Sequence, residues 1–232
     1  MDVFYPRRCP VCGEIVKQRG RSICKDCALK LNPIKGARCF RCSRPLLDER
    51  QEFCYDCSRK RHVYNQGISV FRYQSPVAES LYQLKYHARK EYGVFYGKYA
   101  AVYVKNQIKT WKIEAVIPVP LHPSRLAKRG YNQAEVIAKA LGERLGLPVV
   151  TDAVKRVRKT KPLKELSPQE RRKSLQMAFA PGKNQKRWEN VLIIDDIYTT
   201  GSTIDAVSRI LKETGIAQNV YFLTIAIGTG NN

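Results

Sequence analysis

The chain has 232 residues, 44% of them hydrophobic and 27% charged, which suits one full-sized globular domain and a small additional module. This composition excludes general disorder, collagen-like repeats and a membrane bundle. The formal net charge of +22 favours a polyanionic partner, nucleic acid first of all. The longest apolar stretches, Val191–Ile194 and Val220–Ile227, fall far short of the ~20 residues that cross a bilayer, and the N-terminus lacks the apolar core of a signal peptide. We therefore expect a cytoplasmic protein without a membrane span.

Eight cysteines lie in the first 57 residues as four C-x-x-C pairs that recur every 15 residues. Two such pairs supply the four thiolates of a tetrahedral zinc site, so four pairs predict two structural Zn²⁺ ions. A disulfide framework is disfavoured in a reducing compartment, and redox chemistry does not explain four regular copies. The expected ligands are Cys9, Cys12, Cys24, Cys27, Cys39, Cys42, Cys54 and Cys57.

Two pairings of these knuckles use every ligand, one consecutive and one in a cross-brace. Consecutive pairing is favoured because the two halves look duplicated: RRCPVCGE matches ARCFRCSR, and SICKDC matches EFCYDC. Residues 1–62 are thus expected to form a double zinc ribbon that depends on metal for folding. Its 15 basic and 7 acidic side chains suit contact with DNA or with an acidic protein partner.

Beyond His62, strand-like and helix-like segments alternate, which predicts an α/β domain with a mainly parallel sheet over residues 63–232. Helical periodicity marks residues 134–145 and 204–211, and a short helix, SRLAKR, precedes them. Strands are predicted at Ile68–Tyr73, Ala115–Val119, Val191–Asp195 and Val220–Ile227.

Tyrosines at helical spacing alternate with lysines and arginines in the segment from residue 82 to residue 105. Such a stripe is either the buried face of an amphipathic helix, which is the more common case, or a platform on which single-stranded bases stack. Exposure of the rings decides between the two. The tyrosines are Tyr82 and Tyr86 in one group, and Tyr92, Tyr96, Tyr99 and Tyr103 in the other.

Residues 155–187 are the densest basic stretch, with 12 basic and 2 acidic side chains. We expect this segment to form a basic hood within the larger domain. A solvated basic surface is the simpler alternative to nucleic-acid binding, although the charge exceeds what solubility requires. The candidate DNA contacts are Lys155, Arg156, Arg158, Lys159 and Lys161.

The sequence VLIIDDIYTTGST at 191–203 is a buried strand that ends in two carboxylates and leads through small residues into a helix. Ligands bind at the carboxyl ends of parallel strands. Asp195 and Asp196 could accept hydrogen bonds from vicinal ribose hydroxyls, while a plain helix cap would need one such residue only. Backbone N–H groups and hydroxyls that suit a phosphate come from Thr199, Thr200, Gly201, Ser202 and Thr203.

This loop resembles the phosphoribosyl-pyrophosphate (PRPP) motif of the type I phosphoribosyltransferases, over roughly residues 63–230. With this loop taken together with three other features, the chain resembles most the ComF family, the bacterial competence proteins required for natural transformation. The three features are the cysteine pairs, LYQLKYHARKEYG at 81–93 and VIPVPLHPSRLAKRGYNQAEVIAKAL at 116–141. The resemblance implies a cytoplasmic protein, held near the inner face of the membrane through partners. It would assist the inward transport of single-stranded DNA with a ComFA-type translocase and a DprA-type recombinase loader.

The resemblance also implies roles for single residues. Asp195 and Asp196 would be the catalytic residues and would hold the ribose hydroxyls. Residues 199–203 would hold the 5′-phosphate of PRPP, which would bind together with Mg²⁺. Pyrophosphate would be bound near Lys85, Val119, Arg125 and Arg129.

Whether the domain transfers phosphoribosyl groups, or is reused as a nucleic-acid adaptor, stays open at this point. An active enzyme needs an acceptor pocket, for which the sequence offers only GYNQAE at 130–135. Asn132 and Gln133 could contact an acceptor base or could equally cap the following helix.

Overall fold

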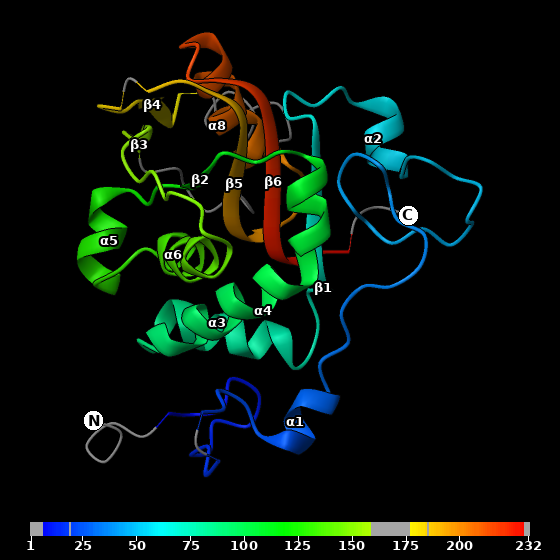
Figure 1. Ribbon diagram of the computed structural model, residues 1–232, viewed down its shortest axis with the longest axis vertical. Helices are drawn as coiled ribbons and strands as arrows, with labels where there is room; N and C mark the ends of the chain where they lie inside the picture. The colour runs from blue at the N-terminus through cyan, green and yellow to red at the C-terminus, as the bar shows by residue number, and fades with distance from the viewer. Residues whose placement is uncertain (1–6, 19, 159–176, 185, 230–232) are drawn as a thin grey trace.

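A parallel β-sheet forms the centre of the protein in a computed structural model that describes residues 7–18, 20–158, 177–184 and 186–229. Four strands in the described part of the chain follow the spatial order β1-β6-β5-β2, and every neighbouring pair is parallel (Figure 1). The expected mainly parallel sheet is confirmed. The strands are β1 (Gln66–Arg72), β2 (Ala115–Pro118), β5 (Trp188–Tyr198) and β6 (Ala217–Ile227).

Helices cover both faces of this sheet because each strand is apolar on both sides. Val191 and Ile193 of β5 belong to one core, which α8 covers, while Leu192 and Ile194 belong to the other, which the remaining long helices cover. Figure 1 shows α3, α4 and α6 grouped together, with α8 apart from them. The helices are α3 (Val77–Tyr86), α4 (Lys90–Thr110), α6 (Gln133–Leu145) and α8 (Ser202–Glu213).

Two smaller elements lie outside the central sheet. The short helix α5 (Pro123–Arg129) follows β2 and ends at Gly130, whose φ of +80° is the left-handed cap that glycine adopts most readily. An antiparallel pair, β3 (Val154–Arg156) and β4 (Phe179–Pro181), is formed by the two ends of the basic hood segment. Residues 159–176 and 185 of that segment, which include Lys159 and Lys161, lie outside the described residues.

The cysteine-rich segment forms two similar units that contact different faces of the larger domain. The first, which contains α1 (Lys25–Leu29), packs through Val11, Ile23 and Leu31 against the core that includes α4. The second, which contains α2 (Tyr55–Arg59), contributes cysteines to the core that includes α8. Figure 1 accordingly shows α1 and α2 well separated from one another.

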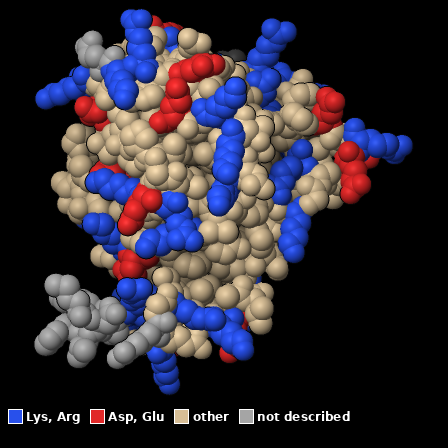
Figure 2. Space-filling view, viewed as in Figure 1, with Lys and Arg blue, Asp and Glu red and all other residues tan. Residues whose placement is uncertain are grey.

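The predicted strands agree with the structure except at their ends. β5 continues beyond Asp195 to Tyr198, because β6 continues to pair with it as far as Ile227. The two carboxylates therefore lie within the strand and not at its end. Figure 2 shows lysines and arginines spread over the face in view, with acidic side chains between them. In the part of the chain that the structure describes, none of the helices has the length and apolar character needed to cross a bilayer.

Candidate functional site

The eight cysteines form two groups of four, and within each group the sulfur atoms lie within 4.8 Å of one another. Both groups combine consecutive pairs, which confirms the favoured pairing and the internal duplication. The two halves contain equivalent hydrogen bonds. The Cys9 N–H donates to the Glu14 carbonyl, and the Cys39 N–H donates to the Arg44 carbonyl, each at 2.8 Å. The first tetrad is Cys9, Cys12, Cys24 and Cys27, and the second is Cys39, Cys42, Cys54 and Cys57.

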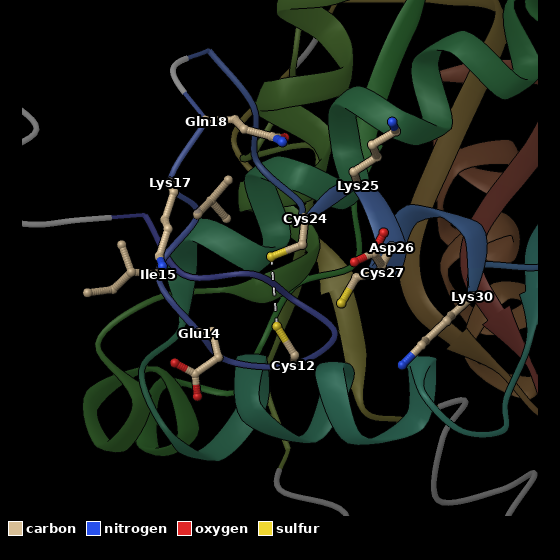
Figure 3. A pocket seen from close by; sticks show the side chains of 11 residues that line it. Cys12, Glu14, Ile15, Lys17, Gln18, Cys24, Lys25, Asp26, Cys27 and Lys30 are labelled. Carbon is tan, nitrogen blue, oxygen red and sulfur yellow. Dashed lines mark hydrogen bonds between the residues drawn. The ribbon is translucent and has the colours of Figure 1, made fainter.

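Both tetrads have the dimensions of a zinc site. The sulfurs of Cys12 and Cys24 are 3.9 Å apart, and those of Cys42 and Cys54 are 3.6 Å apart. Two zinc–sulfur bonds of about 2.3 Å at a tetrahedral angle give a sulfur separation of about 3.8 Å. Figure 3 shows the sulfurs of Cys12, Cys24 and Cys27 pointing toward one another. The donor set, four cysteines per site, is the one that structural zinc prefers.

Asp195 and Asp196 are neighbours near the carboxyl end of β5, and their carboxyl groups lie close enough to interact with one another. Asp196 faces α3 and α6, where its carboxylate forms an ion pair with the Lys85 ammonium and accepts a 3.5 Å hydrogen bond from Gln133 Nε2. The Asp196 and Lys85 side chains are only 6% and 20% exposed. Asp196 and Lys85 thus form a buried ion pair near the carboxyl end of the sheet.

The two carboxyl groups differ in their affinity for a proton. Burial and the neighbouring Asp196 carboxylate raise the pKa of Asp195 well above its usual range. Burial acts on Asp196 as well, but the Lys85 ammonium outweighs it and holds the pKa of Asp196 below its ordinary value. Asp196 is therefore a permanent hydrogen-bond acceptor at neutral pH.

A basic cavity of about 490 Å³ opens beside this acid pair. Arg129, one of the residues that line it, donates a hydrogen bond to Gln133 Oε1 and so connects the cavity with Asp196. Four cations and no carboxylate line the cavity, so it suits an anionic ligand. The lining residues are Lys85, Tyr86, Ala88, Ser124, Arg125, Lys128 and Arg129.

Arg156 of β3 approaches the same place from the hood. Burial and the nearby Arg125 charge lower the pKa of the Arg156 guanidinium, while Asp195 raises it in part. Arg156 therefore lies within electrostatic reach of both the cavity and the acid pair. Lys155, Arg156 and Arg158 are all expected DNA contacts, but Lys155 and Arg158 are exposed whereas Arg156 is half-buried.

A tight turn, Thr199–Gly201, joins β5 to α8. Gly201 has a φ of +74° and precedes the first residue of the helix, and α8 has no side-chain cap. The first N–H groups of the helix are therefore available to a phosphate. A Cβ atom at position 201 would lie 2.5 Å from the Tyr198 hydroxyl, so both the backbone angle and the space require glycine.

The second cysteine tetrad lies directly behind this turn. Arg44, two residues after Cys42, has a side chain that is 8% exposed and forms a 3.2 Å ion pair with Asp56. The same guanidinium donates a 3.3 Å hydrogen bond to the carbonyl of Thr199. Although burial opposes its charge, the Cys42 and Cys54 thiolates help to raise the pKa of Arg44. Arg44 thus connects the metal-binding module to the turn.

The segment after the second tetrad is held to the first turn of α8 by one carboxylate. Asp205 accepts hydrogen bonds from Lys60 at 2.8 Å, and from the backbone N–H of Val63 at 2.9 Å, and lies 2.9 Å from Nδ1 of His62. Burial alone would raise the pKa of Asp205, but His62 and Lys60 lower it. The start of α8 is therefore held by Arg44, through the preceding turn, and by the segment from Lys60 to Val63.

The tyrosine stripe divides in two. Tyr92 and Tyr96 are 3% and 0% exposed, which confirms the interpretation as a helix core for these two. Tyr82 and Tyr86 of α3 are 52% and 64% exposed.

Hydrogen bonding bears on two further expectations. The backbone N–H of Val119 donates to the Ile194 carbonyl, and its carbonyl accepts from Asn132, so the expected pyrophosphate contact at Val119 lacks a free donor. Asn132 caps α6 by accepting from the Ala134 N–H at 3.1 Å. Gln133 is neither a cap nor free for an acceptor base, because Asp196 and Arg129 occupy its amide.

Sequence reasoning missed Arg44 and the inward position of Arg156. A signal for Arg44 existed: in the duplicated ribbon motif the equivalent residue of the first half is Glu14, so the charge reverses at this position of the repeat. No comparable signal marks Arg156, because it lies in a run of cations and only folding of the hood separates it from its neighbours.

Comparisons with known proteins agree with this architecture. Residues 1–58 match the double zinc ribbon domain family, and residues 126–227 match the phosphoribosyl transferase domain family. Competence protein F of Haemophilus influenzae is 27% identical over 93% of this chain and 95% of its own length. Competence protein ComFC of Bacillus subtilis is 28% identical over 88% and 83%, and the DNA utilization protein YhgH of Salmonella typhimurium is 27% identical over 90% and 86%.

The fold and the motifs thus define a phosphoribosyltransferase-type α/β protein that carries an N-terminal double zinc ribbon. Over most of its length the chain is similar to proteins named competence protein F and competence protein ComFC, as the sequence motifs predicted.

Proposed function

We propose that this protein acts in the cytoplasm during natural transformation, where it binds PRPP and assists the inward transport of single-stranded DNA. The names of its relatives, competence and DNA utilization proteins, support a role in DNA handling. The single observation that carries the PRPP site is the buried Asp196–Lys85 pair. Asp196 lies in β5 shortly before an uncapped helix N-terminus, and Lys85 of α3 lines the cavity of cations.

Each part of PRPP has a complementary group in this arrangement. Asp195 and Asp196 accept hydrogen bonds from the ribose hydroxyls, and residues 199–203 bind the 5′-phosphate through the first N–H groups of α8. Pyrophosphate with Mg²⁺ occupies the basic cavity, near Lys85, Arg125 and Arg129. We add Arg156 to this set because its charge interacts with the charges of Arg125 and Asp195. Val119 is left out, since its N–H is already engaged.

DNA contacts in this proposal come from the exposed cations of the hood, Lys155 and Arg158, and from Lys159 and Lys161 outside the described residues. Contacts to phosphate carry no sequence information and depend strongly on salt. The resemblance to competence proteins supports a ComFA-type translocase and a DprA-type recombinase loader as partners, and recruitment to the inner face of the membrane through them.

An active phosphoribosyltransferase is the second candidate function. It is favoured by the same acid pair and cavity, which suit a ribose that develops positive charge as pyrophosphate departs. Against it stands the use of Asn132 and Gln133 within the protein, which leaves neither amide for an acceptor base. Release of pyrophosphate on addition of a nucleobase or nucleotide would establish this activity.

Calorimetric titration of PRPP with Mg²⁺ into the zinc-loaded protein tests the proposal. The double variant Asp195→Asn/Asp196→Asn is expected to lose binding, while Asp48→Asn, which changes an exposed carboxylate paired with Arg50, is expected to retain it. Equal binding by both variants, or none by the parent protein, would contradict a PRPP site. Fluorescence anisotropy with a labelled oligonucleotide, recorded on the same samples, tests DNA binding separately.

A further inference from the structure

Two exposed tyrosines lie beside the basic cavity. Tyr82 and Tyr86 occupy one face of α3, while Val77, Leu81 and Leu84 of the same helix are buried. The centroids of the two tyrosine rings are 4.8 Å apart, and the His87 ring is 5.5 Å from that of Tyr82. These rings therefore form an aromatic surface that the fold does not use for its core.

The aromatic surface is continuous with the candidate sugar-phosphate site. Tyr86 itself lines the basic cavity, and the residue before it, Lys85, pairs with Asp196. The Arg129 guanidinium lies 5.6 Å from the centroid of the Tyr86 ring. A ligand that covers the rings would thus lie next to Arg129 of α5 and the mouth of the basic cavity.

Adjacent aromatic rings and cations are complementary to a chain that alternates bases with phosphates. Bases stack on aromatic rings whatever their sequence, and phosphates pair with the cations beside them. A protein partner would bury the rings but would leave the cations Arg125, Lys128 and Arg129 without anions, unless it were acidic there. A free nucleotide offers only one base for two rings.

We propose that Tyr82 and Tyr86 form a stacking platform for the bases of single-stranded DNA, and that the phosphates of the strand follow Lys128 and Arg129 past the mouth of the cavity. The inference rests on the proposed role in DNA handling and gives that role a location. Its test does not require PRPP to bind.

The test measures binding of a fluorescein-labelled oligothymidylate to the zinc-loaded protein by fluorescence anisotropy across a salt series. We expect Tyr82→Leu/Tyr86→Leu to weaken binding about tenfold or more, because two stacked bases are lost. The salt dependence should stay unchanged, because the phosphate contacts remain. Tyr82→Phe/Tyr86→Phe should bind like the parent protein, since phenylalanine keeps the aromatic face.

A matched control is available on α2. Tyr55 is 51% exposed, and the Arg59 guanidinium lies 4.4 Å from its ring centroid, so Tyr55→Leu removes a similar exposed tyrosine beside an arginine elsewhere. This variant should bind like the parent protein. Photo-crosslinking with an oligonucleotide that contains 5-iodouracil should label Tyr82 or Tyr86.

Three results would overturn the platform: parental affinity in the double leucine variant, an equal loss in Tyr55→Leu, or crosslinks confined to other residues. Absence of binding in every form, the parent included, would reject both the platform and the proposed role in DNA handling. Because PRPP is titrated separately, its failure to bind would leave the DNA result standing.

Discussion

The Arg44 guanidinium links the second cysteine tetrad to the turn before α8, because it lies 3.2 Å from the Asp56 carboxylate and 3.3 Å from the Thr199 carbonyl oxygen. A buried cation beside a zinc tetrathiolate, which carries a net charge of −2, offsets that charge within a poorly solvated region. The backbone of the candidate phosphate loop is thus held by the metal-binding module.

Substitution of Arg44 should weaken PRPP binding even though Arg44 lies behind the loop. We expect Arg44→Met to lower the affinity about fivefold or more, a typical coupling between a supporting contact and a binding site. Hydrogen exchange of residues 199–203 should become faster at the same time. Arg50→Met is the control, because Arg50 pairs with Asp48 in the same module but its side chain is 92% exposed. Parental affinity and exchange in Arg44→Met would show that the loop holds its shape alone.

The two tetrads should differ in their effect on ligand binding. Cys54→Ser and Cys24→Ser make the same chemical change, and each should lower the zinc content by about one ion per chain. Only Cys54 belongs to the core shared with α8 and Tyr198, whereas the first unit packs near α4. Cys54→Ser should therefore impair PRPP binding and Cys24→Ser should spare it. Elemental analysis with calorimetry measures both, and equal losses of affinity would refute the distinction.

The Lys85–Asp196 pair should show strong coupling in a double-mutant cycle. Lys85→Met leaves a buried carboxylate without its partner and should cost about 3–5 kcal/mol of unfolding free energy. Asp196→Asn in the same chain should restore most of it, though not PRPP binding. The exposed pair Lys139–Glu135 is the control, with an expected coupling of about 0.3–0.5 kcal/mol. Denaturant unfolding with zinc present gives these values; additive effects at positions 85 and 196 would argue against the pair.

The contribution of Asp205 should depend on pH. Because the pKa of Asp205 is lowered on folding from 3.8, its stabilising effect is complete above that value and disappears as the pH falls through the lower, folded pKa. Asp205→Asn should therefore be less stable than the parent protein by about 2 kcal/mol at pH 7. The difference should shrink below about pH 4. Thermal unfolding of the two proteins in parallel measures it, and a difference that stays constant with pH would speak against an ionic role.

Much of this architecture could be predicted because it depends on local sequence patterns. The regular cysteine spacing and the repeated motif indicated two zinc sites with consecutive pairing, which the two tetrads confirm. The buried apolar run before Asp195 indicated a central parallel strand, and β5 is one. The end of that strand was misplaced because it depends on how far β6 accompanies it, which no local pattern contains.

The site's wider surroundings could not be predicted for a similar reason. Arg44, Gln133 and Arg156 approach the acid pair or its loop from three different elements, so only tertiary packing brings them there. The tyrosine stripe shows the limit of periodicity. Its spacing is helical within each of the two groups, yet Tyr86 is exposed and Tyr96 is buried, because α3 presents that face to solvent and α4 does not.

The position of β6 in the sheet also bears on how the protein is made. β6 lies between β1 and β5, and Gln66 pairs there with Tyr221, so the two flanking strands meet their common neighbour only after residue 217 has been synthesised. Contacts of such long sequence separation form slowly. During translation, both units that carry the cysteines leave the ribosome well before this sheet can close. They therefore need zinc, or a chaperone, until the larger domain has folded and they can pack against it.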